Sequence, residues 1–165
     1  RPGETAELSL PVPAPGVYTF AVQATEGGGP WYSVRVHSHP YGIDASTDAY
    51  LFRANPSQYF HVPEGRERLS IRASTGGRNQ EMRVRVWRPD GEPALDHVVR
   101  SHEGARQTPE VTVPAGMDGA VWSVAVSAPE QMPVAHYSEN YWLRIIDASP
   151  YLADRPGAVL APAAP

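Results

Sequence analysis

The stretch "QYFHVPEGRERLSIRA", residues 58–73, holds two candidate strands joined by a corner. Residues 58–62 and residues 69–73 each alternate apolar and polar side chains, a pattern typical of strands with one buried face. Between them, Pro63 presets its own φ and Gly65 tolerates positive φ, which gives the corner a physical basis. The stretch therefore predicts two strands that fold back at a tight corner.

Similar phrases occur at residues 10–22, "LPVPAPGVYTFAV", and at residues 111–126, "VTVPAGMDGAVWSVAV". One interpretation is threefold internal symmetry, as in a β-trefoil. The other is a β-sandwich that reuses one corner chemistry at its edges, where Pro is tolerated because it cannot donate to a ladder. We favour the antiparallel, jelly-roll-like sandwich, because the residues between the shared phrases do not match.

The remaining sequence also alternates with period two, and no convincing amphipathic helix is present. Turn signals such as "RPDGEP" at residues 88–93 separate the segments. Eleven strands are expected, at residues 6–10, 17–23, 31–37, 49–53, 58–62, 69–73, 82–87, 95–100, 110–113, 121–127 and 141–147. Many short strands with frequent turns predict an all-β fold.

Composition limits the possible functions. A chain of 165 residues with 41% hydrophobic residues is typical of one globular domain. The net charge of −4 argues against nucleic acid and membrane surfaces as partners, because both attract basic proteins. The chain has no Cys, which excludes disulfides and thiolate chemistry, and its 14 basic residues are all Arg.

We expect a single sandwich domain over residues 1–147 and a Pro/Ala-rich extended tail over residues 148–165, where alternation ceases. Arg1 is not a natural start, so a signal peptide could have preceded it, and we expect a secreted protein.

Catalytic signatures are missing from the sequence: there is no Gly-x-Ser-x-Gly elbow, no His-Glu-x-x-His and no P-loop. We therefore expect neither enzymatic activity nor a cofactor. An alternative is a metal site at "HSHP", where His37 and His39 lie on one face of a strand end and Asp44 follows. The candidates for a further ligand are His61, His97, His102 and His136.

The outward faces of two predicted strands place a Trp beside arginines. In "WYSVRVH" the face opposite Tyr32, Val34 and Val36 carries Trp31, Arg35 and His37. In "MRVRVW" the face opposite Met82, Val84 and Val86 carries Arg83, Arg85 and Trp87. Aromatic rings stack on sugar rings and Arg or His donates to hydroxyls, so such a face suits carbohydrate. The alternative is that both Trp residues cap strand ends beneath loops.

Other aromatic residues are assigned to the core by the same alternation. These are Tyr18, Phe20, Phe60, Trp122 and Tyr141. Trp142 shares the opposite face with Arg144 and Ile146, which makes it a secondary surface candidate.

Residues 59–145 resemble the bacterial pre-peptidase C-terminal domain and related β-sandwich modules of secreted hydrolases. The matching phrases are "YFHVPEG", "MRVRVWRPDGEP", "TVPAGMDGAVWSVAV" and "YWLRI". An acidic stretch of that family is replaced by "NQEMRV" at residues 79–84. The resemblance implies consecutive strands of a sandwich and a non-catalytic accessory role.

We therefore expect an accessory module of a secreted bacterial hydrolase that binds polysaccharide through its Trp/Arg face. The first alternative is a structural module that packs against a catalytic domain of the same parent protein or self-associates. The second is a small metal enzyme that uses the His37 and His39 pair.

Overall fold

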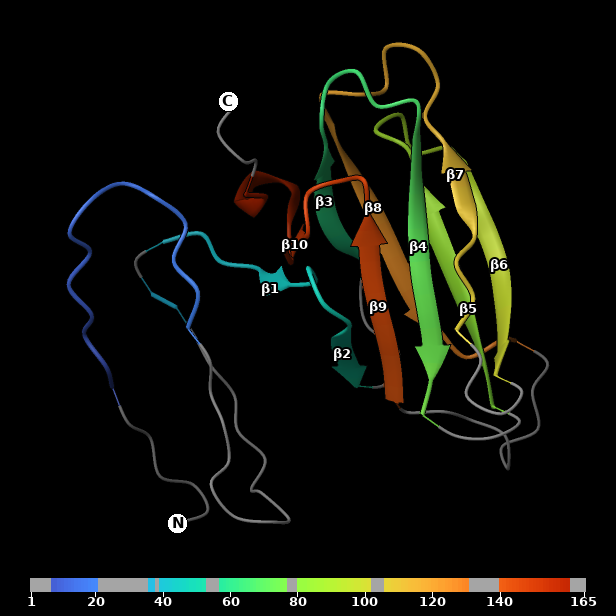
Figure 1. Cartoon of the computed structure of the whole chain (residues 1–165), viewed down its shortest axis with the longest axis horizontal. Helices are drawn as coiled ribbons and strands as arrows, with labels where there is room; N and C mark the ends of the chain where they lie inside the picture. Colours follow the sequence, from blue (N-terminus) through green and yellow to red (C-terminus); the bar gives the residue numbers. More distant parts are fainter. Residues whose placement is uncertain are drawn as a thin grey trace. The chain divides into compact units, whose positions relative to one another are not determined.

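The computed structural model describes residues 7–20, 36–37, 39–52, 57–76, 80–101, 106–130 and 140–160. The chain divides into two compact units, Arg1–His39 and Pro40–Pro165. All strands of the described residues belong to the second unit (Figure 1).

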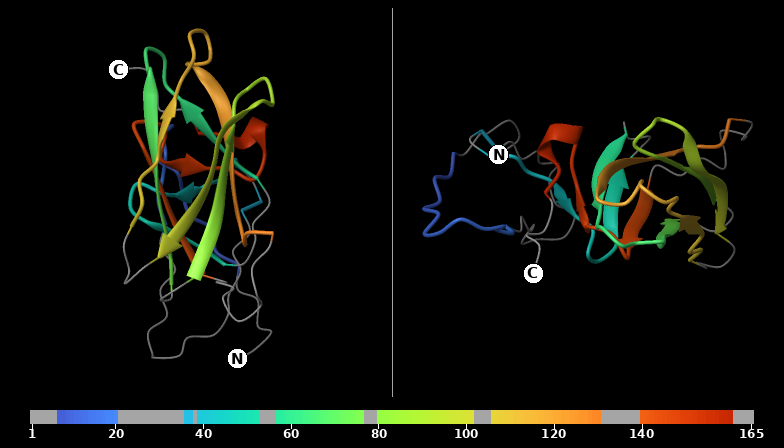
Figure 2. Two further views of the ribbon diagram at one scale, coloured as in Figure 1. Left: turned by 90° about the vertical axis from the view of Figure 1, so that its right-hand side faces the viewer. Right: turned by 90° about the horizontal axis from the view of Figure 1, so that it is seen from above.

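Two four-stranded antiparallel sheets form the body of the second unit, and they face each other (Figure 2). The first sheet has the order β2-β9-β4-β7 and the second has the order β3-β8-β5-β6. A two-stranded sheet pairs β1 with β10. The strands are β1 (Ile43–Asp44), β2 (Ala49–Phe52), β3 (Gln58–Val62), β4 (Arg68–Thr75), β5 (Gln80–Trp87), β6 (Pro93–Ser101), β7 (Glu110–Thr112), β8 (Ala120–Ser127), β9 (Asn140–Ile146) and β10 (Tyr151–Leu152), and a 3₁₀ turn, η2, covers Pro156–Ala158. This architecture confirms the predicted all-β sandwich, and two facing sheets are not the arrangement of a β-trefoil.

The core lies between the two sheets and follows from the alternation of the strands. Every second side chain is buried in β3 and β9, and also in β5 from Met82 and in β8 from Trp122 onward. The largest fully buried side chains are Trp122, Tyr141, Phe60, Leu69, Ile71, Met82, Leu143 and Leu152. The core assignments of Phe60, Trp122 and Tyr141, and the inward positions of Met82, Val84 and Val86, are therefore confirmed.

Two of the three related corners cross from one sheet to the other at the same end of the sandwich (Figure 1). Pro63 follows β3 and leads into β4, and Pro114 precedes β8. We call these two connections the arches. They are joined by a hydrogen bond from the Gly65 amide to Asp118 Oδ2, 2.7 Å long. The recurring phrase thus builds two neighbouring crossings of one sandwich.

The third phrase, near Pro13, behaves differently. Residues 7–20 and 36–37 form no strand. The strands expected at 6–10, 17–23 and 31–37 are therefore wrong where they overlap these residues. Residues 21–35 lie outside the described part of the chain. Tyr18 and Phe20, assigned to the core, are 54% and 53% exposed. Alternation indicates a strand only where a partner strand and a second layer can accept it.

Part of the expected tail is ordered and packed. Leu152 of β10 is 1% exposed and belongs to the core, and Ser149 is buried. Ala153 pairs with Tyr59 through two backbone hydrogen bonds. The expectation of an extended tail is therefore wrong for this stretch, because Leu152 is packed into the core. Residues 161–165 lie outside the described part. Within the described residues no helix is long and apolar enough to cross a membrane.

Candidate functional site

The residues expected to bind carbohydrate fall in different parts of the chain. Trp31 and Arg35 lie outside the described residues. His37 is exposed, lies in no strand and belongs to the N-terminal unit. Arg83, Arg85 and Trp87 lie together on the outer face of β5 in the second sheet, as their alternation predicts.

On that outer face, the charge of Arg83 is already neutralised. Its guanidinium donates two hydrogen bonds to Asp96, 2.7 and 2.6 Å long, and one of 2.8 Å to Glu130. These bonds raise the pKa of Arg83 and hold the pKa of Asp96 below its usual range. Arg83 is therefore held by the protein's own carboxylates and is poorly placed to meet a ligand.

The neighbouring Trp87 is also engaged. Arg85 Cζ lies 5.3 Å from the centroid of the Trp87 ring, a distance typical of a cation–π contact. Both side chains are half-buried, and Arg85 Nε is buried without a hydrogen-bond partner in the described residues. One face of the indole is thus covered by a cation of the same strand.

The expected metal site gains no support. Nowhere in the described residues do three His, Asp or Glu side chains gather closely enough to hold a metal ion. Asp44 Oδ1 accepts a hydrogen bond of 2.8 Å from the Ser46 amide, which closes a local turn. His97 Nε2 bonds Gln107 Oε1 at 3.0 Å, while His102 and His136 lie outside the described part.

The outer face of the first sheet carries an aromatic pair. Tyr50 of β2 lies directly opposite Trp142 of β9, and their ring centroids are 5.5 Å apart at an interplanar angle of 60°. Tyr50 is 51% exposed and donates its hydroxyl to Asn140 Oδ1. A Cβ on Gly76 would lie 2.9 Å from two atoms of the Trp142 ring, so the absent side chain makes room for the indole. The two rings therefore have fixed places on this face.

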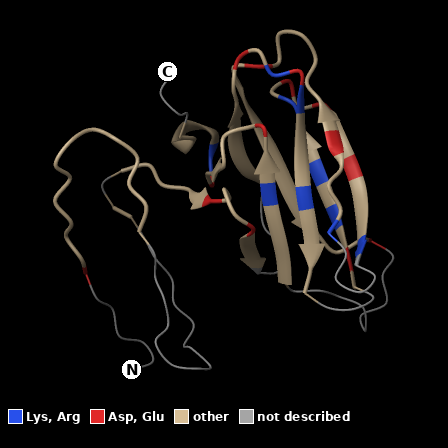
Figure 3. Cartoon of the chain, viewed as in Figure 1, with Lys and Arg blue, Asp and Glu red and all other residues tan. Residues whose placement is uncertain are grey.

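Next to the aromatic pair lie two arginines in direct register. Arg72 of β4 is the cross-strand partner of Arg144 of β9, and both side chains are half-buried. No carboxylate of the described residues forms an ion pair with either one. Like charges directly opposite each other in a sheet are destabilising. The pair concentrates positive charge in the centre of the sheet (Figure 3).

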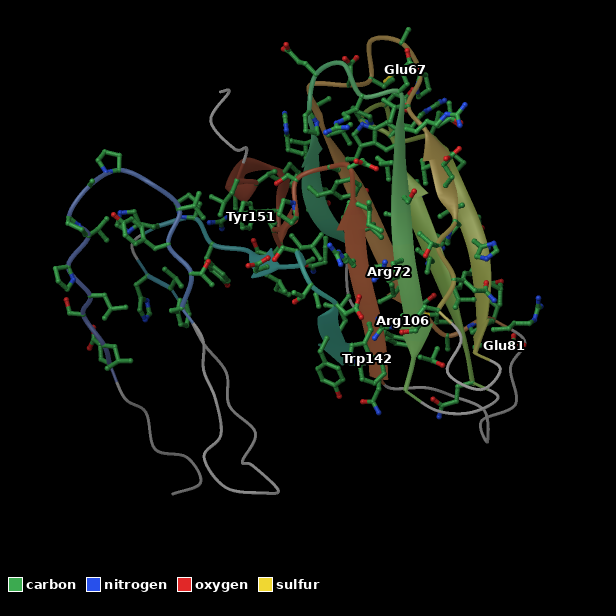
Figure 4. All side chains as sticks on the ribbon, in the orientation of Figure 1. Glu67, Arg72, Glu81, Arg106, Trp142 and Tyr151 are labelled. Atoms are coloured by element: carbon green, nitrogen blue, oxygen red, sulfur yellow. The ribbon has the colours of Figure 1, made fainter. Side chains whose placement is uncertain are left out.

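A third arginine reaches the same surface. Arg106 precedes Gln107, which bridges to Ala73 of β4, and its guanidinium lies 3.0 Å from Asp48 Oδ2 beside β2. Figure 4 shows Arg72, Arg106 and Trp142 together over β4 and β9. We call this surface the Arg–aromatic face, defined by Asp48, Tyr50, Arg72, Arg106, Trp142 and Arg144. It holds three guanidinium groups and one carboxylate.

Of this face, only Trp142 and Arg144 were predicted from the sequence. Tyr50 and Arg72 each occupy an outward position of a predicted strand, which was the available signal. What the sequence did not contain is the strand order, which brings β2, β9 and β4 side by side.

No protein-family model matches the chain, and no curated protein matches its sequence. The resemblance of residues 59–145 to pre-peptidase C-terminal domains therefore stays an expectation.

Proposed function

We propose that this protein is a non-catalytic accessory module of a secreted bacterial hydrolase and that it binds polysaccharide through the Arg–aromatic face. The observation that carries the proposal is the pairing of Tyr50 and Trp142 beside Arg72 and Arg144 on one sheet face. Aromatic rings provide stacking surface for sugar rings, and guanidinium groups donate hydrogen bonds to oxygen atoms. The face thus combines the two contacts that a sugar polymer requires.

The first sheet supports this role better than the face of β5 that the sequence indicated. On β5, Arg83 is held by Asp96 and Glu130, and Trp87 is covered on one side by Arg85. On the first sheet, the donors of Arg72 and Arg144 have no such acceptor in the described residues. A ligand can therefore reach the guanidinium groups of Arg72 and Arg144 without first displacing an ion pair of theirs.

Replacing Trp142 tests the proposal. We expect Trp142→Ala to lose binding to polysaccharide by roughly tenfold or more, because the stacking surface is removed. The measurement is affinity electrophoresis against a panel of soluble polysaccharides, with pull-down on insoluble ones.

Trp87→Ala is the matched control, since it removes an indole from the second sheet. Circular dichroism melts show that each variant is folded. Loss of retardation in Trp87→Ala but not in Trp142→Ala would move the site to β5. No retardation of the wild-type protein by any glycan would contradict the proposal.

A second candidate function, self-association or packing against a catalytic domain, is favoured by the N-terminal unit. Its apolar side chains are exposed: Leu8 is 83%, Leu10 67% and Val12 54% exposed. Exposed apolar side chains in sequence are typical of an interaction surface.

Sedimentation analysis over a range of concentrations tests this second candidate. The double variant Leu8→Ser/Leu10→Ser should shift an oligomer of the wild-type protein towards monomer, because it removes apolar area from the contact. Tyr41→Ser, which removes an exposed aromatic residue of the other unit, should not. A wild-type protein that stays monomeric at every concentration would contradict self-association.

A further inference from the structure

We infer that the Arg–aromatic face selects an acidic polysaccharide, with a carboxylate of one sugar residue held between Arg72 and Arg144 while a neighbouring ring stacks on Trp142. This inference rests on the proposed function, because it names the class of glycan that the same face takes.

The charge distribution is the first argument. Most other arginines of the described sandwich have acidic partners: Arg66 lies 3.6 Å from Asp147, Arg68 3.2 Å from Glu110, and Arg100 3.0 Å from Glu81. The chain as a whole is acidic, with a net charge of −4. Among the described residues, Arg72 and Arg144 nevertheless lie opposite each other without a carboxylate partner.

The geometry of the two side chains is the second argument. Arg72 and Arg144 face each other across adjacent strands, so their guanidinium groups can converge on one small anion. Guanidinium forks match the two oxygens of a carboxylate, and such charge-assisted bonds are stronger than neutral ones. An anion between the two groups would also remove their mutual repulsion.

The spacing to the aromatic pair is the third argument. Trp142 and Arg144 are two positions apart on one face of β9, which corresponds to about 7 Å along the strand. Stacking and charge recognition therefore fall on adjacent parts of one extended ligand. A neutral glycan would contact the rings but would supply no negative charge to the paired arginines, which have no acidic partner in the described part of the chain.

The position within the sheet argues for a glycan over an acidic peptide. Extended peptides gain affinity by adding a strand to a free sheet edge. Arg72 and Arg144 lie on β4 and β9, which are flanked on both sides in the order β2-β9-β4-β7. The backbone groups of these central strands already form hydrogen bonds within the sheet, so a ligand on this face contacts only side chains.

The test compares polymers that differ only in charge. Polygalacturonate is compared with the neutral polymer made from it by reducing its carboxyl groups, and dextran sulfate is compared with dextran. Poly-glutamate supplies carboxylates without sugar rings. Dissociation constants are measured by isothermal titration for the wild-type protein, Arg72→Gln, Arg144→Gln, Trp142→Ala and Arg100→Gln.

We expect polygalacturonate to bind at least roughly tenfold more tightly than its neutral form, and each of Arg72→Gln and Arg144→Gln to remove most of that difference. Trp142→Ala should weaken binding of polygalacturonate as well. Arg100→Gln, which makes the same charge change on the second sheet, should bind like the wild-type protein.

Several results would overturn the inference. Equal binding of the charged and neutral forms of polygalacturonate would refute selection for acidic glycans and leave the proposed function standing. Tighter binding of dextran sulfate than of polygalacturonate would show that the face prefers a sulfate group, and would refute the assignment of a carboxylate. Binding of poly-glutamate as tight as that of polygalacturonate would make the face a general anion site. Binding of no polymer would refute both the inference and the proposed function.

Discussion

The arginines on the outer faces of this sandwich differ in whether a carboxylate of the protein holds their charge. Arg83 donates to Asp96 and Glu130, and its charge belongs to an internal network. Arg72 and Arg144 oppose each other and have no acidic partner in the described residues. The first arrangement stabilises the fold, whereas the second costs stability that a bound anion would restore.

This difference predicts opposite effects of one substitution at two positions. Arg72→Gln should increase the free energy of unfolding, because it removes a like-charge contact across β4 and β9, by an amount no larger than the roughly 0.2–1 kcal/mol typical of a cross-strand pair. Arg83→Gln should decrease it, because Asp96 and Glu130 lose their cation. Urea denaturation at low ionic strength measures both.

The salt dependence of unfolding distinguishes the electrostatic contribution of Arg72 from its packing contribution. The increase in the free energy of unfolding caused by Arg72→Gln should shrink in 1 M salt, where the Debye length falls to about 3 Å. A variant that is less stable than the wild-type protein at low salt would show that the stem of Arg72 contributes more by packing than its charge costs.

At the scale of elements, the two arches connect the two sheets at one end of the sandwich. Each arch joins a strand of one sheet to a strand of the other. The Val113 amide of one arch donates a hydrogen bond of 2.8 Å to the backbone carbonyl of Glu67 in the other. Gly65 and Gly116 have φ of 76° and 79°, a region that favours glycine. The Asp118 carboxylate adds a charged acceptor for the Gly65 amide.

The arch contact predicts an acid-sensitive contribution to stability. The Gly65 amide lowers the pKa of Asp118 in the folded protein. A lowered folded pKa means that the contribution is present above the unfolded value, about 3.9, and is lost as the pH falls through the folded value. Asp118→Asn should therefore unfold at lower urea concentration than the wild-type protein at pH 7, and this difference should shrink at pH 3.

Asp154→Asn is the control, because Asp154 is exposed after β10 and forms no ion pair or side-chain hydrogen bond within the described residues. A difference between Asp118→Asn and the wild-type protein that persists unchanged at pH 3 would assign the effect to the shape of the side chain instead of its charge.

The strands that could be predicted are those whose alternation is long and has a partner. Residues 58–62 match β3, and residues 121–127 lie within β8, because both insert alternate side chains into the core. Residues 17–20 show the same pattern but remain exposed, since no sheet in the described residues accepts them. β1 and β10 were missed because two residues cannot display a period.

At the scale of the whole molecule, the candidate site could be predicted only in fragments. The sequence shows which side chains of a strand share a face, and this placed Trp142 with Arg144. It does not show that β9 lies between β2 and β4, and this order assembles the Arg–aromatic face. Arg106 and Asp48 were missed because both lie outside strands, where alternation gives no direction.

The pairing of β2 with β9 also determines at which stage of folding the Arg–aromatic face forms. Tyr50 and Asn140, which it brings into hydrogen-bonding contact, are 90 residues apart in the chain. Closing so long a loop is entropically costly, and β-sandwiches dominated by such pairings fold in roughly milliseconds to seconds. During synthesis, β2 emerges before β9 and cannot pair until β9 has been made. Tyr50 therefore lacks its aromatic partner Trp142 until most of the sandwich has been synthesised. A chain that ends before residue 140 would keep Arg72 but could not assemble the face, and its recognition surface is therefore a late product of folding.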